Sequence, residues 1–500
     1  MRTLALACLI LFFATGAALA DGAVRVTLIH VNDVYQISPV DKGSRGGLAR
    51  LATLKDQIKS SSPHTLLLLG GDTLSPSVAS NTFKGAQMIA AWNAAGLDLA
   101  VVGNHEFDFG PSVLLARLGE SRFPWLGANV LDKQGRLFGP LRTSEIRSFE
   151  GVKVGFLGVI TASTAKSSSG GPGIVFGDPI ATAKRQAARL RKLGAHVVVA
   201  LTHLDMADDQ RLAASGAVDL ILGGHEHAVL ASLAGHAPIL KAGSDARNAA
   251  RIDLFIDRHN GRLDHLDWEL IPVAADIPPQ TATAEVVAGF ENRLSTLLDT
   301  PVGKTTVSLD ARQASNRSQE TNLGNWLADI YRASARADVA IVNGGSIRSN
   351  TTYGPGTLSK RDILSILPFE NPIVKLDITG RDLRRALEHG LAETRETLES
   401  GRFPQISGLR IAFDARRPAG NRVTRVAVND EALDDGRHYS LALSNYLAAG
   451  GDGYTLFKGL PFLIAPENAL SETAEVIEAL TAASPIAPHT DGRIERLDTP

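Results

Sequence analysis

The sequence predicts an α/β protein with two domains, of which the first is layered. Its 500 residues are too many for one ordinary hydrophobic core. From Val24 to about Ile271, short apolar runs alternate with helical stretches, which is typical of strands buried on both faces between helices. A proline-rich break follows, and the second half has its own pattern of helices and strands. We therefore expect a layered α/β domain followed by a second α/β domain.

Composition and charge exclude several classes of function. Hydrophobic residues make up 44% of the chain and charged residues 21%, which is ordinary for a globular protein. The 51 Lys and Arg residues nearly balance the 53 Asp and Glu residues, so the formal net charge is −2. This balance argues against binding to a nucleic-acid polymer. Small anionic substrates stay open, because a local arginine or a bound metal ion can hold them.

The first twenty residues predict a secretory signal peptide. Arg2 precedes an apolar run from Leu4 to Phe13, and small residues then form an A-x-A cleavage site ending at Ala20. The apolar run is too short to span a bilayer. The only cysteine, Cys8, lies inside this segment, so we expect no disulfide in the mature chain. We expect a periplasmic or secreted protein with no membrane anchor after cleavage.

The pattern along the chain predicts four segments. Residues 1–20 form the signal peptide and residues 21–271 the first domain. Residues 272–300 form a linker and a connecting helix, because adjacent prolines interrupt the pattern before a helical stretch resumes. Residues 301–500 form the second domain.

Nearly every apolar run of the first domain ends in a polar cluster. Five blocks follow one another, namely ND at 32–33, GGD at 70–72, GNHE at 103–106, TH at 202–203 and GGHEH at 223–227. In open α/β sheets, ligands gather at the carboxyl ends of the strands. Carboxylate, amide and imidazole donors suit Zn²⁺, Mn²⁺, Fe²⁺ or Co²⁺ rather than Ca²⁺ or a thiolate site. The blocks together therefore predict a metal site.

The five blocks, in this order, resemble the signature of the metallophosphoesterase superfamily. With the second half included, essentially the whole mature chain resembles the secreted 5′-nucleotidase and UDP-sugar hydrolase family. The resemblance implies a layered β-sandwich flanked by helices, followed by an α/β substrate domain. It also implies two divalent metal ions (Mn, Zn, Co or Fe) and release of phosphate from nucleoside 5′-monophosphates and related nucleotides by attack of a metal-bound hydroxide.

The resemblance also assigns six metal ligands. Asp72 is the carboxylate that bridges the two ions. One metal ion would be completed by Asn104, His203 and His225, and the other by Asp33 and His227.

By the same resemblance, His105 is the catalytic histidine that stabilises the transferred phosphoryl group or protonates the leaving oxygen. Asp108 is its partner, since a carboxylate beside an imidazole holds it cationic and oriented. For Glu106, a capping or solvated position stays open.

Tyr35 departs from the family pattern, which usually shows Asp-x-His where this chain has Asp33-Val34-Tyr35. In an extended segment, residues i and i+2 face the same side, so Tyr35 can still face the metals. Three interpretations are open. The tyrosine coordinates as phenolate, or it hydrogen-bonds a metal-bound water or the substrate phosphate, or it only packs. We favour the hydrogen bond, together with a weaker first metal site.

The second half is expected to hold the substrate. In NGGSIR, paired glycines beside Arg348 suit an anionic oxygen, and the family makes Arg348 a phosphate contact across the cleft. Asn371 is a further expected polar contact. Phe403 and Tyr454 stand where the family sandwiches a nucleobase between two rings. The family often has an acid shortly after the second ring, but here none occurs before Glu467.

Three alternatives to the nucleotidase hypothesis stay open. The first is a phosphodiesterase acting on 2′,3′-cyclic nucleotides or nucleotide-sugars, and the second is a sugar-phosphate phosphatase. The third, from another class, is a non-catalytic protein that binds nucleotide or phosphate. The sequence does not determine the oligomeric state.

Overall fold

The computed structural model describes residues 22–167, 173–369, 371–394 and 400–498. The predicted signal peptide lies outside the described residues. Among the helices of the described segments, none has both the length and the apolar character that crossing a membrane requires.

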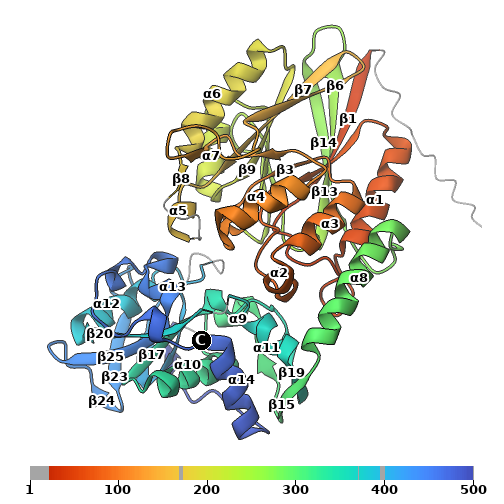
Figure 1. Ribbon diagram of the computed structural model, residues 1–500. Helices are drawn as coiled ribbons and strands as arrows, with labels where there is room; N and C mark the ends of the chain where they lie inside the picture. The colour runs from red at the N-terminus through yellow and green to blue at the C-terminus, as the bar shows by residue number, and fades with distance from the viewer. Residues whose placement is uncertain (1–21, 168–172, 370, 395–399, 499–500) are drawn as a thin grey trace, which may run out of the picture.

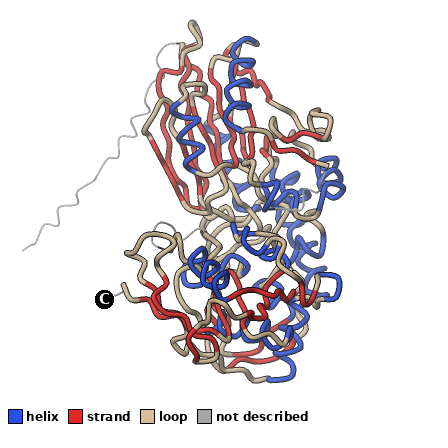
Figure 2. The backbone as a smooth tube through the Cα atoms, turned by 90° about the vertical axis from the view of Figure 1, so that its left-hand side faces the viewer, coloured by secondary structure: helices blue, strands red, loops and turns tan. Residues whose placement is uncertain are grey.

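Two six-stranded sheets packed face to face form the first domain (Figures 1 and 2). The first sheet has the order β14 (Leu263–Pro272), β13 (Asn248–Asp257), β1 (Ala23–Val31), β2 (Thr65–Leu69), β3 (Leu99–Val101), β4 (Trp125–Leu126). The second has the order β11 (Val229–Ser232), β12 (Ile239–Ala242), β10 (Leu220–Gly223), β9 (Val197–His203), β7 (Val152–Ile160), β6 (Ser144–Phe149). A small pair, β5 (Val130–Asp132) and β8 (Ile174–Phe176), lies beside them.

Helices cover the outer faces of both sheets. The first sheet carries α1 (Leu48–Ser61), α3 (Ala86–Ala95) and α4 (Gly110–Glu120), and the second carries α6 (Pro179–Lys192) and α7 (Met206–Ala214). Strand β1 shows why both faces of the first sheet are apolar. Its side chains alternate, so Val26 and Leu28 enter the core between the sheets while Ile29 and Val31 pack under the helices.

Strands β1 to β4 run parallel, as do β7, β9 and β10. Their carboxyl ends face the second domain, and α2 (Val78–Phe83) and α5 (Thr164–Ser167) lie at this end of the first domain (Figure 1). The 3₁₀ turn η1 (Asn104–Phe107) follows β3. This arrangement confirms the predicted layered α/β class of the first domain.

The second domain is a separate α/β unit. Its larger sheet has the order β21 (Pro404–Ser407), β17 (Val339–Asn343), β25 (His438–Ser444), β20 (Ile373–Thr379), β26 (Phe462–Ile464). Its smaller sheet has the order β24 (Glu431–Ala432), β23 (Val423–Val428), β22 (Leu409–Phe413), β27 (Ile494–Arg496). Two short pairs join β15 (Pro301–Thr305) to β19 (Gly356–Ser359) and β16 (Leu309–Asp310) to β18 (Thr352–Tyr353).

The helices and 3₁₀ turns of this domain are α9 (Gln313–Asn316), α10 (Asn322–Ala335), η2 (Gly344–Ser346), α11 (Lys360–Ile366), α12 (Gly380–Gly390), α13 (Asn445–Ala448), η3 (Gly451–Gly453), η4 (Thr455–Phe457), η5 (Pro466–Asn468) and α14 (Glu472–Ala483). The amphipathic stretch NLGNWLADIYR forms α10, which begins where the Thr321 hydroxyl accepts a hydrogen bond from Gly324 N–H. Its apolar face is buried under the larger sheet and α14.

Helix α8 (Thr281–Leu298) connects the two domains, and the chain then enters β15 (Figure 1). A small apolar cluster joins elements from both sides, because α2 and α8 contribute Val78 and Leu294 while α11 contributes Leu364. Arg361 of α11 also forms an ion pair with Asp299 at the end of α8. These contacts hold the second domain against the carboxyl ends of the first-domain strands.

Candidate active site

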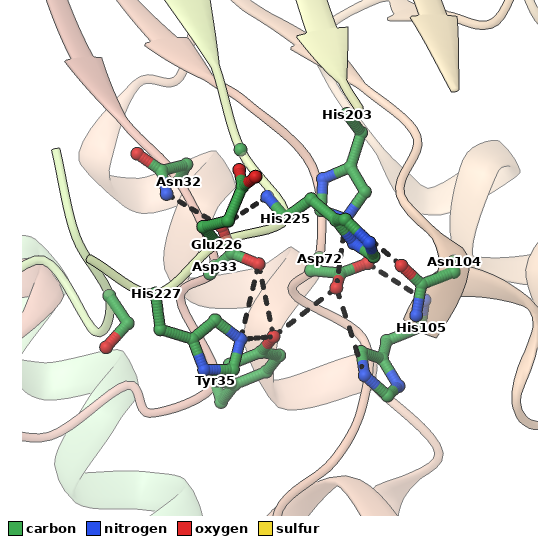
Figure 3. Close-up of polar contacts among 12 residues, drawn as sticks. Asn32, Asp33, Tyr35, Asp72, Asn104, His105, His203, His225, Glu226 and His227 are labelled. Carbon is green, nitrogen blue, oxygen red and sulfur yellow. Dashed lines mark hydrogen bonds and ion pairs between the residues drawn. The ribbon is translucent and has the colours of Figure 1, made fainter. Parts of the chain in front are cut away.

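Side chains from several strand ends converge at the edge that faces the second domain (Figure 3). Asp33 follows β1, Asp72 follows β2, and His203 is the last residue of β9. Each offers a ligand atom, and these atoms all lie within 4.8 Å of one another. All three side chains are buried. The predicted convergence of these three positions is therefore present in the structure.

The local backbone makes this convergence possible. Asp33 and Asp72 both adopt positive φ angles, 53° and 56°, which turn their carboxylates back across the strand ends. Gly103 packs directly against Asp72, and a Cβ at this position would collide with the Asp72 carboxylate. The glycine of the GNHE block is therefore needed for the close approach of these loops.

His203 and Asn104 form one side of the cluster. His203 Nε2 lies 3.2 Å from Asp72 Oδ2 and 3.2 Å from Asn104 Oδ1. His203 Nδ1 lies 2.8 Å from the Gly70 carbonyl oxygen. A hydrogen bond donated to this oxygen leaves Nε2 free to bind a metal ion.

Unbalanced negative charge raises the pKa of His203. Burial lowers this pKa, but Asp72 and Asp33 outweigh burial and raise it to about 10. Burial in turn raises the pKa of Asp33 to about 6. The site therefore has a strong electrostatic preference for positive charge, which bound cations would satisfy.

Tyr35 and His227 form the other side. Tyr35 Oη lies 2.9 Å from His227 Nε2, 3.2 Å from Asp33 Oδ1 and 3.3 Å from Asp72 Oδ2 (Figure 3). His227 Nε2 lies 3.6 Å from Asp33 Oδ1. Only 6% of Tyr35 is exposed, so its hydroxyl is confined among these ligand atoms.

His225 lies at the rim of the cluster. Its backbone N–H donates to Asp33 Oδ2 at 3.0 Å, and its ring centroid is 5.1 Å from that of His203. Its Nε2 lies 3.3 Å from Asp205 Oδ1. Sequence reasoning missed Asp205, although its position two residues after His203 was a usable signal.

Two buried charged residues brace the ligand loops. Glu106 accepts hydrogen bonds from the backbone N–H groups of Asp72, Thr73, Leu74 and Gly103. Burial raises the pKa of Glu106 to about 7. Glu106 is therefore not solvated, since it joins the GGD and GNHE loops through their backbones.

Lys241 performs a comparable role on the other sheet, and sequence reasoning missed it. Its Nζ donates to the carbonyl oxygens of Leu204 and Gly224, 2.7 and 2.9 Å away, and forms an ion pair with Asp209 at 2.9 Å. These carbonyls directly follow His203 and directly precede His225.

His105 and Asp108 form a separate pair at the mouth of the cluster. His105 Nδ1 lies 2.7 Å from Asp108 Oδ2, and His105 Nε2 lies 3.9 Å from Asp72 Oδ2. Burial lowers the pKa of His105, but Asp108 and Asp72 outweigh it, and the net effect raises this pKa above its usual value. The imidazole therefore favours its cationic form, with Nε2 directed to the metal-ligand side.

The second domain contributes Arg348 and Phe369. The Arg348 guanidinium lies 5.7 Å from the centre of the Tyr35 ring and 5.9 Å from that of Phe369. Phe369 stacks against His105, with ring centroids 6.2 Å apart. Burial, Arg348 and Arg317 together hold the pKa of His227 well below its ordinary value. Sequence reasoning missed Phe369 and Arg317, since neither lies in a motif with a chemical signature of its own.

The other predicted substrate contacts have partners inside the second domain. Asn371 donates to Glu472 Oε1 from its backbone nitrogen at 3.0 Å and from its amide at 3.3 Å. Phe403 is 1% exposed, and its ring lies 6.4 Å from that of Phe413.

Tyr454 is fully buried and stacks on Phe457 with centroids 5.2 Å apart. Its hydroxyl donates to the Arg402 carbonyl at 2.7 Å. Base stacking by Phe403 and Tyr454 stays a prediction.

The donors fit divalent cations. They are carboxylate oxygens, an amide oxygen and imidazole nitrogens, and Asp72 lies between the His203 side and the Tyr35 side. The cluster is buried and rich in carboxylates, and hydrogen bonds to backbone groups brace its loops, which suits a bound metal ion.

Comparisons with known proteins agree with this geometry. Residues 26–229 match the family Calcineurin-like phosphoesterase, and residues 301–459 match the family 5′-nucleotidase, C-terminal domain. The snake venom 5′-nucleotidase of Crotalus adamanteus is 29% identical over 503 residues, which cover 90% of this chain and 85% of that protein. The crystal structure of a 5′-nucleotidase precursor from Thermus thermophilus is 28% identical, with a TM-score of 0.86 and coverage of 95% of this chain and 100% of that one.

The trifunctional nucleotide phosphoesterase protein YfkN of Bacillus subtilis is 30% identical over 486 residues, or 87% of this chain. The match spans only 32% of YfkN. The fold and the site define a metal-dependent phosphoric ester hydrolase with a separate C-terminal domain. The chain belongs to the 5′-nucleotidase family, in which a metallophosphoesterase domain precedes a 5′-nucleotidase C-terminal domain.

Proposed function

We propose that this protein is an exported phosphohydrolase that uses two divalent cations to release phosphate from nucleoside 5′-monophosphates and related nucleotides. One observation carries the proposal. The guanidinium of Arg348, from the second domain, lies against the ring of Tyr35, whose hydroxyl is within 3.3 Å of both Asp33 and Asp72. A cation suited to phosphate thus lies next to the tyrosine whose hydroxyl contacts both acids.

The chain's residues divide the proposed reaction between them. Asp33, Asp72 and His227 would hold one cation, while Asp72, Asn104, His203 and His225 would hold the other. When bound, the two cations activate the attacking water and neutralise charge on the phosphoryl oxygens.

Two residues would then act on the phosphate itself. Arg348 holds and orients it, since a guanidinium can bind two of its oxygens at once. His105 stabilises the transferred phosphoryl group or donates a proton from Nε2 to the leaving oxygen, because Nδ1 is engaged by Asp108.

Two kinds of observation bear on the leaving group. The names of the Crotalus and Bacillus relatives indicate nucleotides. Against this, Phe403 and Tyr454 contact rings of their own domain, and the expected acid after Tyr454 is missing. These two observations favour a sugar-phosphate phosphatase as the second candidate.

A substrate panel distinguishes these functions. Phosphate release would be measured from AMP, UDP-glucose, 2′,3′-cyclic AMP and a sugar phosphate, after chelation and re-addition of Mn²⁺, Zn²⁺ or Co²⁺. The proposal expects AMP to be hydrolysed fastest and activity to return only with metal. Preference for the sugar phosphate would support the second candidate. Stoichiometric metal binding without turnover of any ester would indicate a binding protein instead.

Export rests on the leader-like first twenty residues. Expression of the full chain in a bacterial host, followed by fractionation and N-terminal sequencing, checks it. The proposal expects periplasmic or secreted protein that begins at Asp21. Intact protein retained in the cytoplasm would contradict it.

A further inference from the structure

We infer that Tyr35 is itself a metal ligand, in the position where this family ordinarily has a histidine, and that its phenolic oxygen shares a cation with Asp33, Asp72 and His227. The inference rests on the proposed two-metal function and specifies one of its sites. It differs from the sequence-based interpretation, in which Tyr35 only hydrogen-bonds a water or the phosphate.

The spacing of the four donor atoms carries the argument. Tyr35 Oη lies 2.9, 3.2 and 3.3 Å from His227 Nε2, Asp33 Oδ1 and Asp72 Oδ2. His227 Nε2 and Asp33 Oδ1 are 3.6 Å apart. Two ligands each about 2.1 Å from one cation are about 3.0 Å apart at a right angle and about 3.4 Å apart in a tetrahedron. These four separations, 2.9 to 3.6 Å, are therefore close to those of ligand atoms that share one cation.

The neighbouring half of the site gives an internal reference. His203 Nε2 lies 3.2 Å from both Asp72 Oδ2 and Asn104 Oδ1, and these three residues belong to the ligand set that the resemblance implies. The distances of Tyr35 Oη from its neighbours, 2.9 to 3.3 Å, are close to this value. If the hydroxyl occupied the cation's own position, its distances to these atoms would be about 2.1 Å.

Hydrogen bonding alone leaves one of these contacts without a proton. A phenol can donate one proton and accept one from His227 Nε2, so it can donate to only one of the two carboxylate oxygens that lie 3.2 and 3.3 Å away, and the other faces the phenol oxygen lone pair to lone pair. A shared cation satisfies all of these lone pairs together. On coordination the phenol O–H bond breaks, its proton leaves to solvent and an oxygen–metal bond forms, with no electron transferred.

A further consequence concerns the choice of metal. A phenolate is a harder, anionic donor than a neutral imidazole, so this site should accept a harder cation, such as ferric iron, better than an Asp-x-His site. Phenolate bound to ferric iron absorbs visible light by ligand-to-metal charge transfer. This absorption reports coordination directly and does not depend on catalysis.

The test begins with full-length protein stripped by chelation and reloaded with a ferric salt. Bound iron is quantified by elemental analysis, and the visible spectrum is recorded. Wild type is expected to bind iron and show a charge-transfer band, and Tyr35→Phe is expected to lose the band. Tyr439→Phe, at a buried tyrosine of the second domain, is the matched control and should keep it. Tyr35→His should also lack the band.

A zinc titration of the same variants adds a second readout. Tyr35→Phe should weaken one of two binding events by about 10- to 100-fold, and Tyr35→His should restore it. The inference fails if stoichiometric iron gives no band in wild type, if the band persists in Tyr35→Phe, if iron does not bind, or if Tyr35→Phe leaves zinc affinity unchanged. Lack of phosphatase activity with the band present would contradict the proposed function and leave this inference intact.

Discussion

The two domains contribute to the active site in different ways. The first domain supplies a dense set of ligand-type side chains at strand ends, and Glu106 and Lys241 brace their loops through backbone groups. The second domain supplies mainly Arg348 and Phe369 at the same point. Its other predicted contacts are engaged within their own domain. The cluster of ligand-type side chains is therefore set by the local geometry of the first domain, and the side chains beside it by how the second domain is docked.

The largest loss of activity is expected for a substitution in the first domain. His105→Ala should lower kcat by about 10² to 10⁴, because it removes a general acid or charge-stabilising group that operates at the reacting phosphate. Metal content should be unchanged, since His105 is not one of the proposed ligands. Phosphate release and elemental analysis on the same sample check both statements. Unchanged kcat would refute the proposed role.

The second-domain counterpart is Arg348→Ala. We expect kcat/KM to fall by about 10² to 10³, as when other preorganised donors to a developing charge are removed. Arg348→Lys keeps the charge but loses the paired donors, so it should fall between wild type and alanine. A rate equal to wild type in both variants would mean that the second domain does not contact the phosphate.

Glu106→Gln probes the bracing of the first domain. The carboxylate accepts four backbone N–H groups, whereas a glutamine amide would turn donors of its own toward some of them. We expect about a tenfold or greater loss of metal affinity, measured by titration of the stripped protein. Glu120→Gln, whose parent side chain is exposed and paired with Arg117, is the control and should bind metal normally. Equal affinity in both variants would contradict a bracing role.

Asp108→Asn should lower kcat by less, and the direction in which it shifts the pH profile follows from the pKa of His105. The raised pKa of His105 keeps the imidazolium populated to higher pH than a free imidazole. Without the Asp108 charge this pKa falls, so activity should be lost at a lower pH as the pH rises. We expect about a tenfold loss of kcat near neutral pH, within the range for general acid–base groups. The pH profile of kcat measures this, and an unshifted alkaline limb would exclude the partnership.

Much of the first domain could be predicted from sequence because its signals are local. Fully apolar runs predicted buried strands, and polar residues at their ends met because parallel strands share an edge. Asp33, Asp72 and His203 converge for this reason.

The rest depends on contacts between distant segments. Glu106 is buried only because the GGD loop folds over it, and Phe369 reaches His105 only because the domains are docked. The side-chain direction of Asn371 is likewise set by Glu472, about a hundred residues away along the chain. Periodicity and motif spacing do not encode such long-range choices.

The smallest effect is expected for a substitution of an aromatic residue in the second domain. Tyr454→Phe removes the hydroxyl that donates to Arg402 but keeps the ring stacked on Phe457. Losing one buried hydrogen bond should lower the free energy of unfolding by about 1 kcal/mol. The KM for AMP should stay unchanged, because the hydroxyl faces a backbone carbonyl of its own domain. Thermal denaturation and steady-state kinetics separate these two readouts. A rise in KM without loss of stability would instead place the Tyr454 hydroxyl on the substrate, which would make the second domain's recognition surface larger than Arg348 and Phe369.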